Sequence, residues 1–427
     1  MNKLIGFTRK FSSSAALNSV KTVTVVGGGL MGSGIAQVAA QAGQNVTIVD
    51  IKPELLDHAQ KSIQNNLQRV AKKVHKDDPI KMEQFVKESI SRIKITTNVE
   101  EAANVDLIVE AIVEKLEPKQ ELFNKLDKIS PEHTIFATNT SSISVNAIGS
   151  GIKRKDRFGG LHFFNPVPVM RLLEVIKTES MSEETYKIMM EWGKSVGKTC
   201  ITCKDTPGFV VNRLLGPYSA EALRLYERGD ASKEDIDIGM KLGAGYPMGP
   251  FELADYTGLD TNKYVLEVLH KLTNNPVFRP IPLLDKMVSE GKLGVKTGEG
   301  FYKYKKYKGE ARLARTSTNA FQCCVVLCQS SQANIACEDP YCILVTKSDA
   351  SAKDIDTAMK LGAGYPMGPL ELADFTGLDT KQSVLATLYK ETQNPVFGPI
   401  ALLDKLVAEG KFGRKTGEGI YNYLEKI

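Results

Sequence analysis

The sequence predicts an α/β domain with a doubly wound sheet, followed by an all-α domain of which a part is repeated. Three observations predict this fold class. Short β-branched runs alternate with amphipathic stretches as far as Asp205, the pattern beyond that residue is helical, and residues 230–304 recur as 349–423 with about 53 of 75 positions identical. A chain of 427 residues is also too long for one ordinary core. The expected segments are a leader at 1–20, a sheet domain at 21–206, a helical domain at 207–305, an irregular linker at 306–348 and a repeat of the helical segment at 349–427.

The first elements are a strand from Val23, a glycine-rich turn, a helix, and a second strand that ends at Asp50. Glycines spaced G-x-G-x-x-G let the chain turn tightly and bring backbone N–H groups to a pyrophosphate at the helix N-terminus. The residues expected at this cofactor site are Gly27, Gly29, Leu30, Met31 and Gly32. The Asp50 carboxylate is expected to bond the adenosine ribose, and no arginine follows closely to accept a 2′-phosphate. We therefore expect a Rossmann-like fold that binds NAD, with a purely structural glycine turn as the alternative.

The remaining elements follow in order along the chain. An amphipathic helix is expected from Pro53 to about Val74, and a second helix over 118–129. The Cys200 and Cys203 pair lies in an alternating TCITC run, which favours a buried strand over a redox or metal site. Helices resume at 206–208, where proline suits a first helical turn. The other expected strands span 93–96, 105–110, 134–138, 158–163 and 172–176.

Charge and hydropathy exclude several classes of protein. The formal net charge of +5 comes from basic and acidic residues spread along the chain, which is too weak an excess to indicate nucleic acid binding. No run approaches the ~18 apolar residues of a membrane span. The cysteines between 323 and 342 match no zinc-ligand spacing, so no metal site is expected. The basic, serine-rich first 21 residues predict a mitochondrial transit segment, with a disordered cytosolic tail as the alternative.

His162 and Glu174 are the first candidates for chemistry. They lie twelve residues apart on two expected strands, so neighbouring strands can bring the imidazole and the carboxylate within hydrogen-bond reach. A carboxylate on one ring nitrogen fixes the tautomer, and the other nitrogen can then take a proton from a substrate hydroxyl as hydride leaves the same carbon. By spacing alone, a structural histidine is at least as common.

Several motifs together closely resemble the short-chain L-3-hydroxyacyl-CoA dehydrogenases of mitochondrial β-oxidation. They are GGGLMGSG, VEAIVE, NTSS, LHFFNPVPVM, LLEVI, KDTPGFVVNRLL and GYPMGPFELAD, and the resemblance covers about Val20 to Lys305. It implies oxidation of an L-3-hydroxyacyl-CoA to the 3-ketoacyl-CoA with NAD, in the mitochondrial matrix. The alternatives are a catalytically retired homologue that serves as a binding protein, and a related 3-hydroxyacid dehydrogenase.

The resemblance also implies roles for individual residues. His162 matches the catalytic base and Glu174 its partner, while Ser141 and Asn212 match groups that orient the substrate. The implied cofactor contacts are Glu114, Lys119, Ser141, Asn165 and Lys296. The implied coenzyme A contacts are Asn66, Lys73 and Ser141, and Asn66 stands where the family has a serine. An ordinary solvated helix face remains the alternative for the lysines near residue 73.

The chain departs from the resemblance beyond Tyr304, where single-activity members of that family end. The second copy has no counterpart of the expected helix at 207–228, so two interpretations remain open. In one, the second copy packs on the first as an internal partner and replaces the usual homodimer. In the other, two alternative carboxyl-terminal exons have been joined and one copy is surplus. The aperiodic linker and the close similarity of the copies favour the second interpretation.

Overall fold

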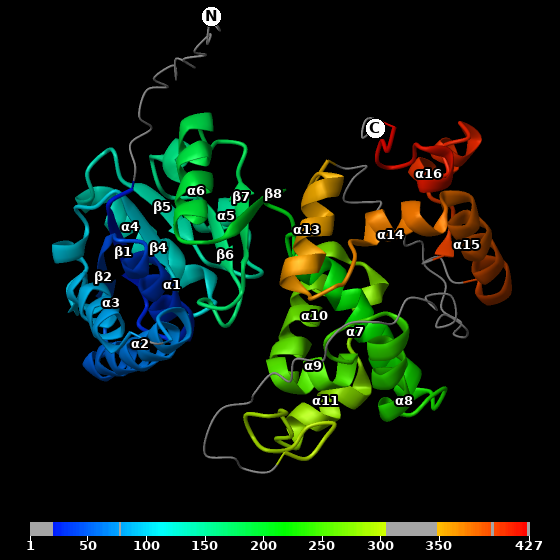
Figure 1. The fold of residues 1–427 in the computed structure, drawn as a ribbon, viewed down its shortest axis with the longest axis horizontal. Helices are drawn as coiled ribbons and strands as arrows, with labels where there is room; N and C mark the ends of the chain where they lie inside the picture. The colour runs from blue at the N-terminus through cyan, green and yellow to red at the C-terminus, as the bar shows by residue number, and fades with distance from the viewer. Residues whose placement is uncertain (1–19, 77, 305–347, 394–396, 425–427) are drawn as a thin grey trace, which may run out of the picture.

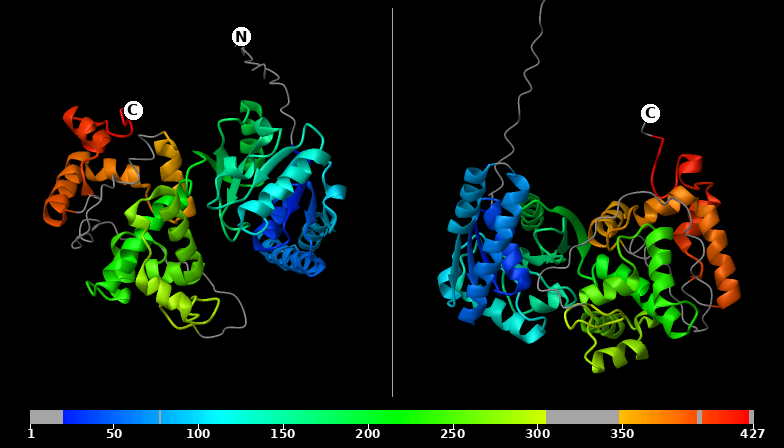
Figure 2. Two further views of the ribbon diagram at one scale, coloured as in Figure 1. Left: turned by 180° about the vertical axis from the view of Figure 1, so that it is seen from behind. Right: turned by 60° about the horizontal axis from the view of Figure 1, so that its bottom comes forward.

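The computed structural model describes residues 20–76, 78–304, 348–393 and 397–424. The expected leader and linker lie almost entirely outside these described residues, as do the cysteines between 323 and 342. A sheet domain and a helical domain lie side by side, and the second helical unit lies against both (Figures 1 and 2). Among the described helices, none is long and apolar enough to cross a membrane.

The sheet has eight strands in the order β3-β2-β1-β4-β5-β6-β7-β8. Neighbouring strands are parallel except β6 and β7, which are antiparallel. The order reverses between β1 and β4, and in such sheets ligands bind beyond the carboxyl ends of the strands at this point. The strands span Thr22–Val26 (β1), Asn45–Val49 (β2), Ile93–Thr96 (β3), Leu107–Glu110 (β4), Ile135–Thr138 (β5), Phe158–Phe163 (β6), Leu172–Lys177 (β7) and Thr199–Lys204 (β8).

Helices cover both faces of the sheet. Side chains of α1, α2 and α6 form a core with one face, and side chains of α4, α5, α13 and the start of α7 form a core with the other. The helices of the sheet domain are Leu30–Gln41 (α1), Pro53–Val74 (α2), Pro79–Ser91 (α3), Leu116–Ile129 (α4), Val145–Ile148 (α5) and Glu183–Ser195 (α6), with short 3₁₀ turns at Glu100–Ala102 (η1) and Lys155–Arg157 (η2). The predicted α/β domain is thereby confirmed, although the sequence analysis did not identify α3 or α6.

The first helical unit forms its own core around α7, α9, α10 and α11. Its helices are Val211–Glu227 (α7), Lys233–Ile238 (α8), Pro250–Thr257 (α9), Leu259–Thr273 (α10) and Pro282–Ser289 (α11), with a π turn at Gly239–Gly243 (η3) and a 3₁₀ turn at Pro276–Phe278 (η4). The expectation that α7 begins at 206–208 is wrong. Gly208 and Phe209 have φ angles of +75° and +47°, so the backbone is left-handed there and the helix starts only at Val211.

The second unit repeats these helices without a counterpart of α7. Its elements are Ala352–Gly362 (α13), Pro369–Thr376 (α14), Leu378–Thr392 (α15), Ala401–Ala408 (α16) and the 3₁₀ turn Arg414–Thr416 (η6). In each unit a buried aspartate closes the terminal loop: Asp255 accepts hydrogen bonds from the backbone of Phe301 and Tyr302, and Asp374 does the same 119 residues further on. The aspartate of each LAD motif therefore binds the backbone that directly follows the GEG motif of the same unit.

The two units meet through reciprocal contacts. The rings of Tyr246 and its counterpart Tyr365 stack with centroids 4.3 Å apart. A Cβ atom on Gly245 would lie 3.1 Å from Pro366, and one on Gly364 would lie 2.8 Å from Pro247. Equivalent residues exchange the same contacts, which describes a local two-fold axis of the kind found in homodimers. Reciprocal contacts of this kind are what the internal-partner interpretation expects.

Candidate active site

The glycine turn lies between β1 and α1, at the point where the strand order reverses. A Cβ atom on Gly27 would lie 2.4 Å from the Ala111 carbonyl oxygen, and one on Gly32 would lie 1.8 Å from the Gly27 carbonyl oxygen. Gly29 differs, because its Cβ would have nothing within 4 Å. Two of the glycines are therefore required by packing, while the middle one presents bare backbone to open space.

The turn fits a dinucleotide. Helix α1 has no side-chain N-cap and no acidic residue in its first turn, so the backbone N–H groups of Leu30 and Met31 are available to an anion. Asp50, directly after β2, accepts hydrogen bonds from the N–H groups of Gly28 (2.7 Å) and Lys52 (3.0 Å). Its carboxylate is thus fixed beside the turn, which suits a ribose diol and disfavours a 2′-phosphate.

The predicted imidazole and carboxylate pair forms across β6 and β7. His162 and Glu174 are directly opposite each other in the antiparallel register, and His162 Nδ1 lies 2.6 Å from Glu174 Oε2. Both side chains are buried, and the rings of Phe164 and Phe209 lie 4.6 and 5.6 Å from the imidazole. With Nδ1–H donating to the carboxylate, Nε2 is left as a proton acceptor.

Glu174 has a second task that sequence reasoning missed. Its Oε1 atom accepts hydrogen bonds from the N–H groups of Val210 and Val211, each at 3.0 Å. The carboxylate therefore caps the N-terminus of α7 and orients the imidazole at the same time. The only sequence signal for this contact is TPGF before the helix, because the left-handed Gly208 and Phe209 turn those N–H groups toward β7.

Ser141 and Asn212 are brought to the same place. The Asn212 side-chain amide donates to the Ser141 carbonyl oxygen at 3.4 Å. Asn212 directly follows Val210 and Val211, whose N–H groups donate to Glu174. The Ser141 N–H group donates to Glu114 Oε1 at 2.8 Å, and the Thr140 hydroxyl donates to the same oxygen at 2.6 Å. Hydrogen bonds thus connect Glu114, the NTSS loop and α7.

Lys119 connects the Glu114 carboxylate, which binds this loop, to Glu110 at the end of β4. Its Nζ atom is buried and lies 2.6 Å from Glu110 Oε1 and 3.1 Å from Glu114 Oε2. Burial alone would raise the pKa of Glu114, but the Lys119 charge and the Thr140 and Ser141 donors outweigh it and hold that pKa below its ordinary value. Glu110, which sequence reasoning did not identify, completes the network by accepting from the Thr138 hydroxyl at 2.6 Å.

Four other expected site residues lie apart from this network. Asn66 and Lys73 lie seven residues apart on α2, where Lys73 is exposed. Asn165 is exposed just after β6. Lys296 forms an ion pair with Asp260 in the helical domain, and Lys415 repeats this pair with Asp379. In the described part of the chain, no hydrogen bond or ion pair joins these residues to His162 or to the glycine turn.

The positions of the two cysteines of β8 in the fold agree with a structural role for both. Cys200 belongs to the core on one face of the sheet and Cys203 to the core on the other, so the two thiols point away from each other. Burial raises the pKa of Cys200 to about 11. Within the described residues, no three histidine, cysteine or acidic side chains gather as a metal site.

Comparisons with known proteins agree along most of the chain. The sequence model of the 3-hydroxyacyl-CoA dehydrogenase NAD binding domain matches residues 22–206, and that of the C-terminal domain of the same family matches 208–304 and 336–423. The chain is 54% identical to the mitochondrial hydroxyacyl-coenzyme A dehydrogenases of pig, over 69% of this chain and 96% of the relative, and of human, over 70% and 98%. The crystal structure of 3-hydroxybutyryl-CoA dehydrogenase from Escherichia coli K12 is similar with a TM-score of 0.79 at 29% identity, covering 92% of this chain and 99% of that one. This last similarity is too long to end at Tyr304, so it includes the second unit.

Proposed function

The chain belongs to the 3-hydroxyacyl-CoA dehydrogenase family, and from this premise we propose that His162 and Glu174 are the proton-transfer pair of its active site. The protein is an NAD-dependent 3-hydroxyacyl-CoA dehydrogenase of fatty-acid β-oxidation. The observation that carries the proposal is the 2.6 Å contact between His162 Nδ1 and Glu174 Oε2, with both side chains buried.

His162 Nε2 accepts the hydroxyl proton of the substrate. Glu174 keeps the other ring nitrogen protonated, and its negative charge stabilises the imidazolium that forms. NAD, when bound, accepts the hydride from the carbon that carried the hydroxyl. The proton and the hydride leave the same C–OH unit, so the alcohol becomes a ketone and the balance is complete. In the reverse direction the imidazolium returns the proton to the oxygen.

Ser141 and Asn212 orient the substrate oxygen. Both are polar, and the hydrogen bond between them holds the NTSS loop beside the α7 turn that Glu174 caps. A fixed geometry of this kind supplies much of the rate of such reactions, because the reacting atoms must meet at ~3 Å. Glu114 and Lys119 act through the loop that carries Ser141.

NAD is held by Gly27 to Gly32 and by Asp50. The bare backbone at Gly29 and the uncapped start of α1 receive the pyrophosphate, and the Asp50 carboxylate receives the adenosine ribose. Asn165 and Lys296 are assigned to the cofactor by family resemblance alone.

Substitution of the pair tests the assignment. We expect His162→Ala and Glu174→Gln to lower kcat for acetoacetyl-CoA reduction by about 10²–10⁴-fold, while NADH still binds. The assay follows NADH absorbance, and NADH binding is measured by fluorescence. His133→Ala is the matched control, because His133 is an exposed histidine of the same domain. Full activity in either variant would contradict the assignment, and oxidation of free 3-hydroxyacids without coenzyme A would favour a related dehydrogenase.

We assign the coenzyme A phosphates to the α2 face that carries Asn66 and Lys73. Lys72 provides a control on the same helix, because it faces the groove between α2 and α3. We expect Lys73→Glu to raise the KM for acetoacetyl-CoA about tenfold and to leave the KM for NADH unchanged, since one charge-assisted phosphate contact is lost. Equal effects of Lys72→Glu and Lys73→Glu would contradict this assignment.

Our proposals for the oligomeric state and the compartment rest on the second unit and on the relatives. We propose that the chain acts as a monomer in the mitochondrial matrix, because the second unit occupies the reciprocal interface and the relatives are mitochondrial. Sedimentation at micromolar concentration checks the first point, and import into isolated mitochondria checks the second. A stable homodimer would contradict the internal-partner interpretation.

A further inference from the structure

Helix α13 of the second unit completes the helical layer over the sheet face that carries Glu174. On β7, Leu172 and Ile176 point to the same face as Glu174, and both belong to the core that includes Ile355 and Met359 of α13. Ile355, Ala358 and Met359 are fully buried, as is Glu174. Figure 1 shows α13 between β8 and the rest of the second unit. A helix that lies about 180 residues beyond β7 along the chain therefore packs on the sheet face that carries Glu174.

The contact between α13 and the first turn of α7 is close. A Cβ atom on Gly362, the last residue of α13, would lie 2.9 Å from Val211 Cγ2 and 2.7 Å from Leu172 Cδ2. Val211 is one of the two residues whose N–H groups donate to Glu174, and Leu172 precedes Glu174 by two positions on β7. Val211 is β-branched and has little freedom to move aside.

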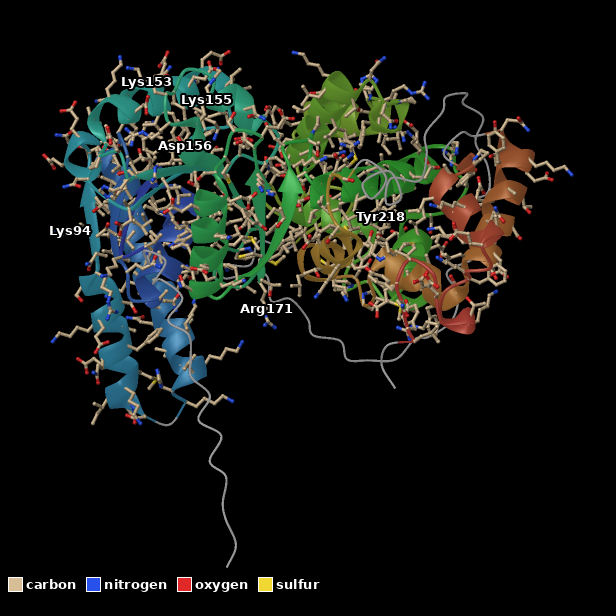
Figure 3. All side chains as sticks on the ribbon, turned by 90° about the horizontal axis from the view of Figure 1, so that it is seen from above. Lys94, Lys153, Lys155, Asp156, Arg171 and Tyr218 are labelled. Carbon is tan, nitrogen blue, oxygen red and sulfur yellow. The ribbon has the colours of Figure 1, made fainter. Side chains whose placement is uncertain are left out.

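Polar contacts hold α13 in this position. The Lys204 N–H group, at the end of β8, donates to the Asp349 carbonyl oxygen at 3.0 Å. The Asp349 carboxylate lies 4.0 Å from the Arg213 guanidinium in the first turn of α7. A chain of aromatic rings also joins the units, because Tyr218 of α7, which Figure 3 labels, packs edge-to-face on Tyr246, and Tyr246 stacks on Tyr365.

We propose that α13 is a positioning element of the active site, and that it holds the first turn of α7 against Glu174 and thereby sets the orientation of His162. The residue that transmits this contact is Gly362, through Val211. The proposal rests on the proposed roles of His162 and Glu174. It makes the active site dependent on the second unit.

The first unit offers an internal control for this role. The counterpart of α13 is α8 with the π turn η3, which packs on α9 and not on the sheet. Ile238 and Leu242 of that segment are 49% and 65% exposed, whereas the equivalent Thr357 and Leu361 are half-buried. Gly243 and Ile236 are therefore the matched positions for Gly362 and Ile355, with the same residue types in the segment that packs on α9.

The test compares Gly362→Val with Gly243→Val in the full chain. We expect Gly362→Val to lower kcat for acetoacetyl-CoA, counted per NADH-binding site, by about 10- to 100-fold, because a small displacement of a catalytic group has an effect of this size. The KM for NADH stays unchanged. The proton NMR resonance of the His162 Nδ1–H group shifts upfield as its bond to Glu174 lengthens. Gly243→Val keeps both the resonance and kcat within twofold of the parent chain.

A second matched pair serves if Gly362→Val does not fold. Ile355→Ala removes packing under α13 without adding a clash, and Ile236→Ala removes the same atoms from the core of the first unit. We expect Ile355→Ala, and not Ile236→Ala, to lower kcat per NADH-binding site about tenfold. Equal kcat in the members of either folded pair, or an unchanged His162 resonance in Gly362→Val, overturns the proposal. That outcome differs from a failure of the proposed function, in which Glu174→Gln itself keeps full activity.

Discussion

Replacement of Lys119 by methionine tests the network beneath the NTSS loop. The Lys119 ammonium is 1% exposed and balances Glu110, which is fully buried, and Glu114, which is 26% exposed. Methionine has nearly the same length but no charge, so among the described residues Glu110 keeps the donors on Thr138 and Ile112. Removal of one partner from a buried ion pair costs about 3–5 kcal/mol, because the remaining charge stays without compensation. We expect the free energy of unfolding of the sheet domain to fall by this amount.

The assay uses the only tryptophan of the chain. Trp192 lies on α6 and is buried against the sheet, so its fluorescence during urea titration reports unfolding of the sheet domain. Lys125→Met is the control on the same helix, because Lys125 pairs with Glu100 at 3.3 Å and both side chains are more than half exposed. Such a surface pair contributes about 0–1 kcal/mol.

A double variant separates the charge from the packing. Glu110→Gln combined with Lys119→Met removes the uncompensated carboxylate, and we expect it to recover at least half of the lost stability. A loss below about 1 kcal/mol in Lys119→Met, or a double variant no more stable than the single one, would refute the reasoning.

Three further predictions concern the glycine turn, a thiol and a carboxyl group. Gly32→Ala should abolish NADH binding, because its Cβ would lie 1.8 Å from the Gly27 oxygen. Gly29→Ala should fold normally and only weaken NADH binding, because its Cβ would have nothing within 4 Å. NADH fluorescence titration measures the binding, and a melting curve checks the folding. Cys200, with a pKa of about 11, should react with iodoacetamide at pH 8 about a hundredfold more slowly than a thiol of pKa 9.0. Mass spectrometry measures the labelling rate, and labelling as fast as that of an ordinary thiol would contradict this prediction. The lowered pKa of Glu114 stabilises the folded protein. This stabilisation is complete above the unfolded pKa of 4.5 and is lost as the pH falls through the folded pKa. In thermal unfolding, Glu114→Gln should therefore lose less stability than the parent chain when the pH falls from about 5 to 3.

The sequence predicted the contact between His162 and Glu174 because strand register is a local property. His162 and Glu174 stand twelve residues apart with a short connection, and the antiparallel register of β6 and β7 places them opposite each other. The eight strands were predicted within about two residues for the same reason, since alternating and β-branched runs carry their own signal.

The contacts of Glu174 with α7 were not predictable in this way. Pro207 looked like a first helical residue, and only the left-handed backbone at Gly208 and Phe209 moves the start of α7 to Val211. Lys119 was expected at the cofactor by resemblance, but a sequence does not show that its ammonium lies buried between two carboxylates. Both cases depend on long-range packing.

The repeat was visible in the sequence, but its arrangement was not. The two copies share most of their residues, so neither composition nor periodicity indicates which one contacts the sheet. The missing counterpart of α7 was the one available signal, because the second unit lacks the helix on which α9 packs in the first unit. In the structure α13 packs on β7, β8 and α7 as well as on α14 of its own unit.

The covalent link between the sheet and α13 changes how this association responds to concentration. Two separate subunits come apart on dilution by mass action, whereas a segment of the same chain keeps an effective concentration that dilution does not alter. The contact between α13 and the sheet face that carries Glu174 is therefore kept at any protein concentration, and the specific activity should be the same in a nanomolar assay as in a concentrated compartment.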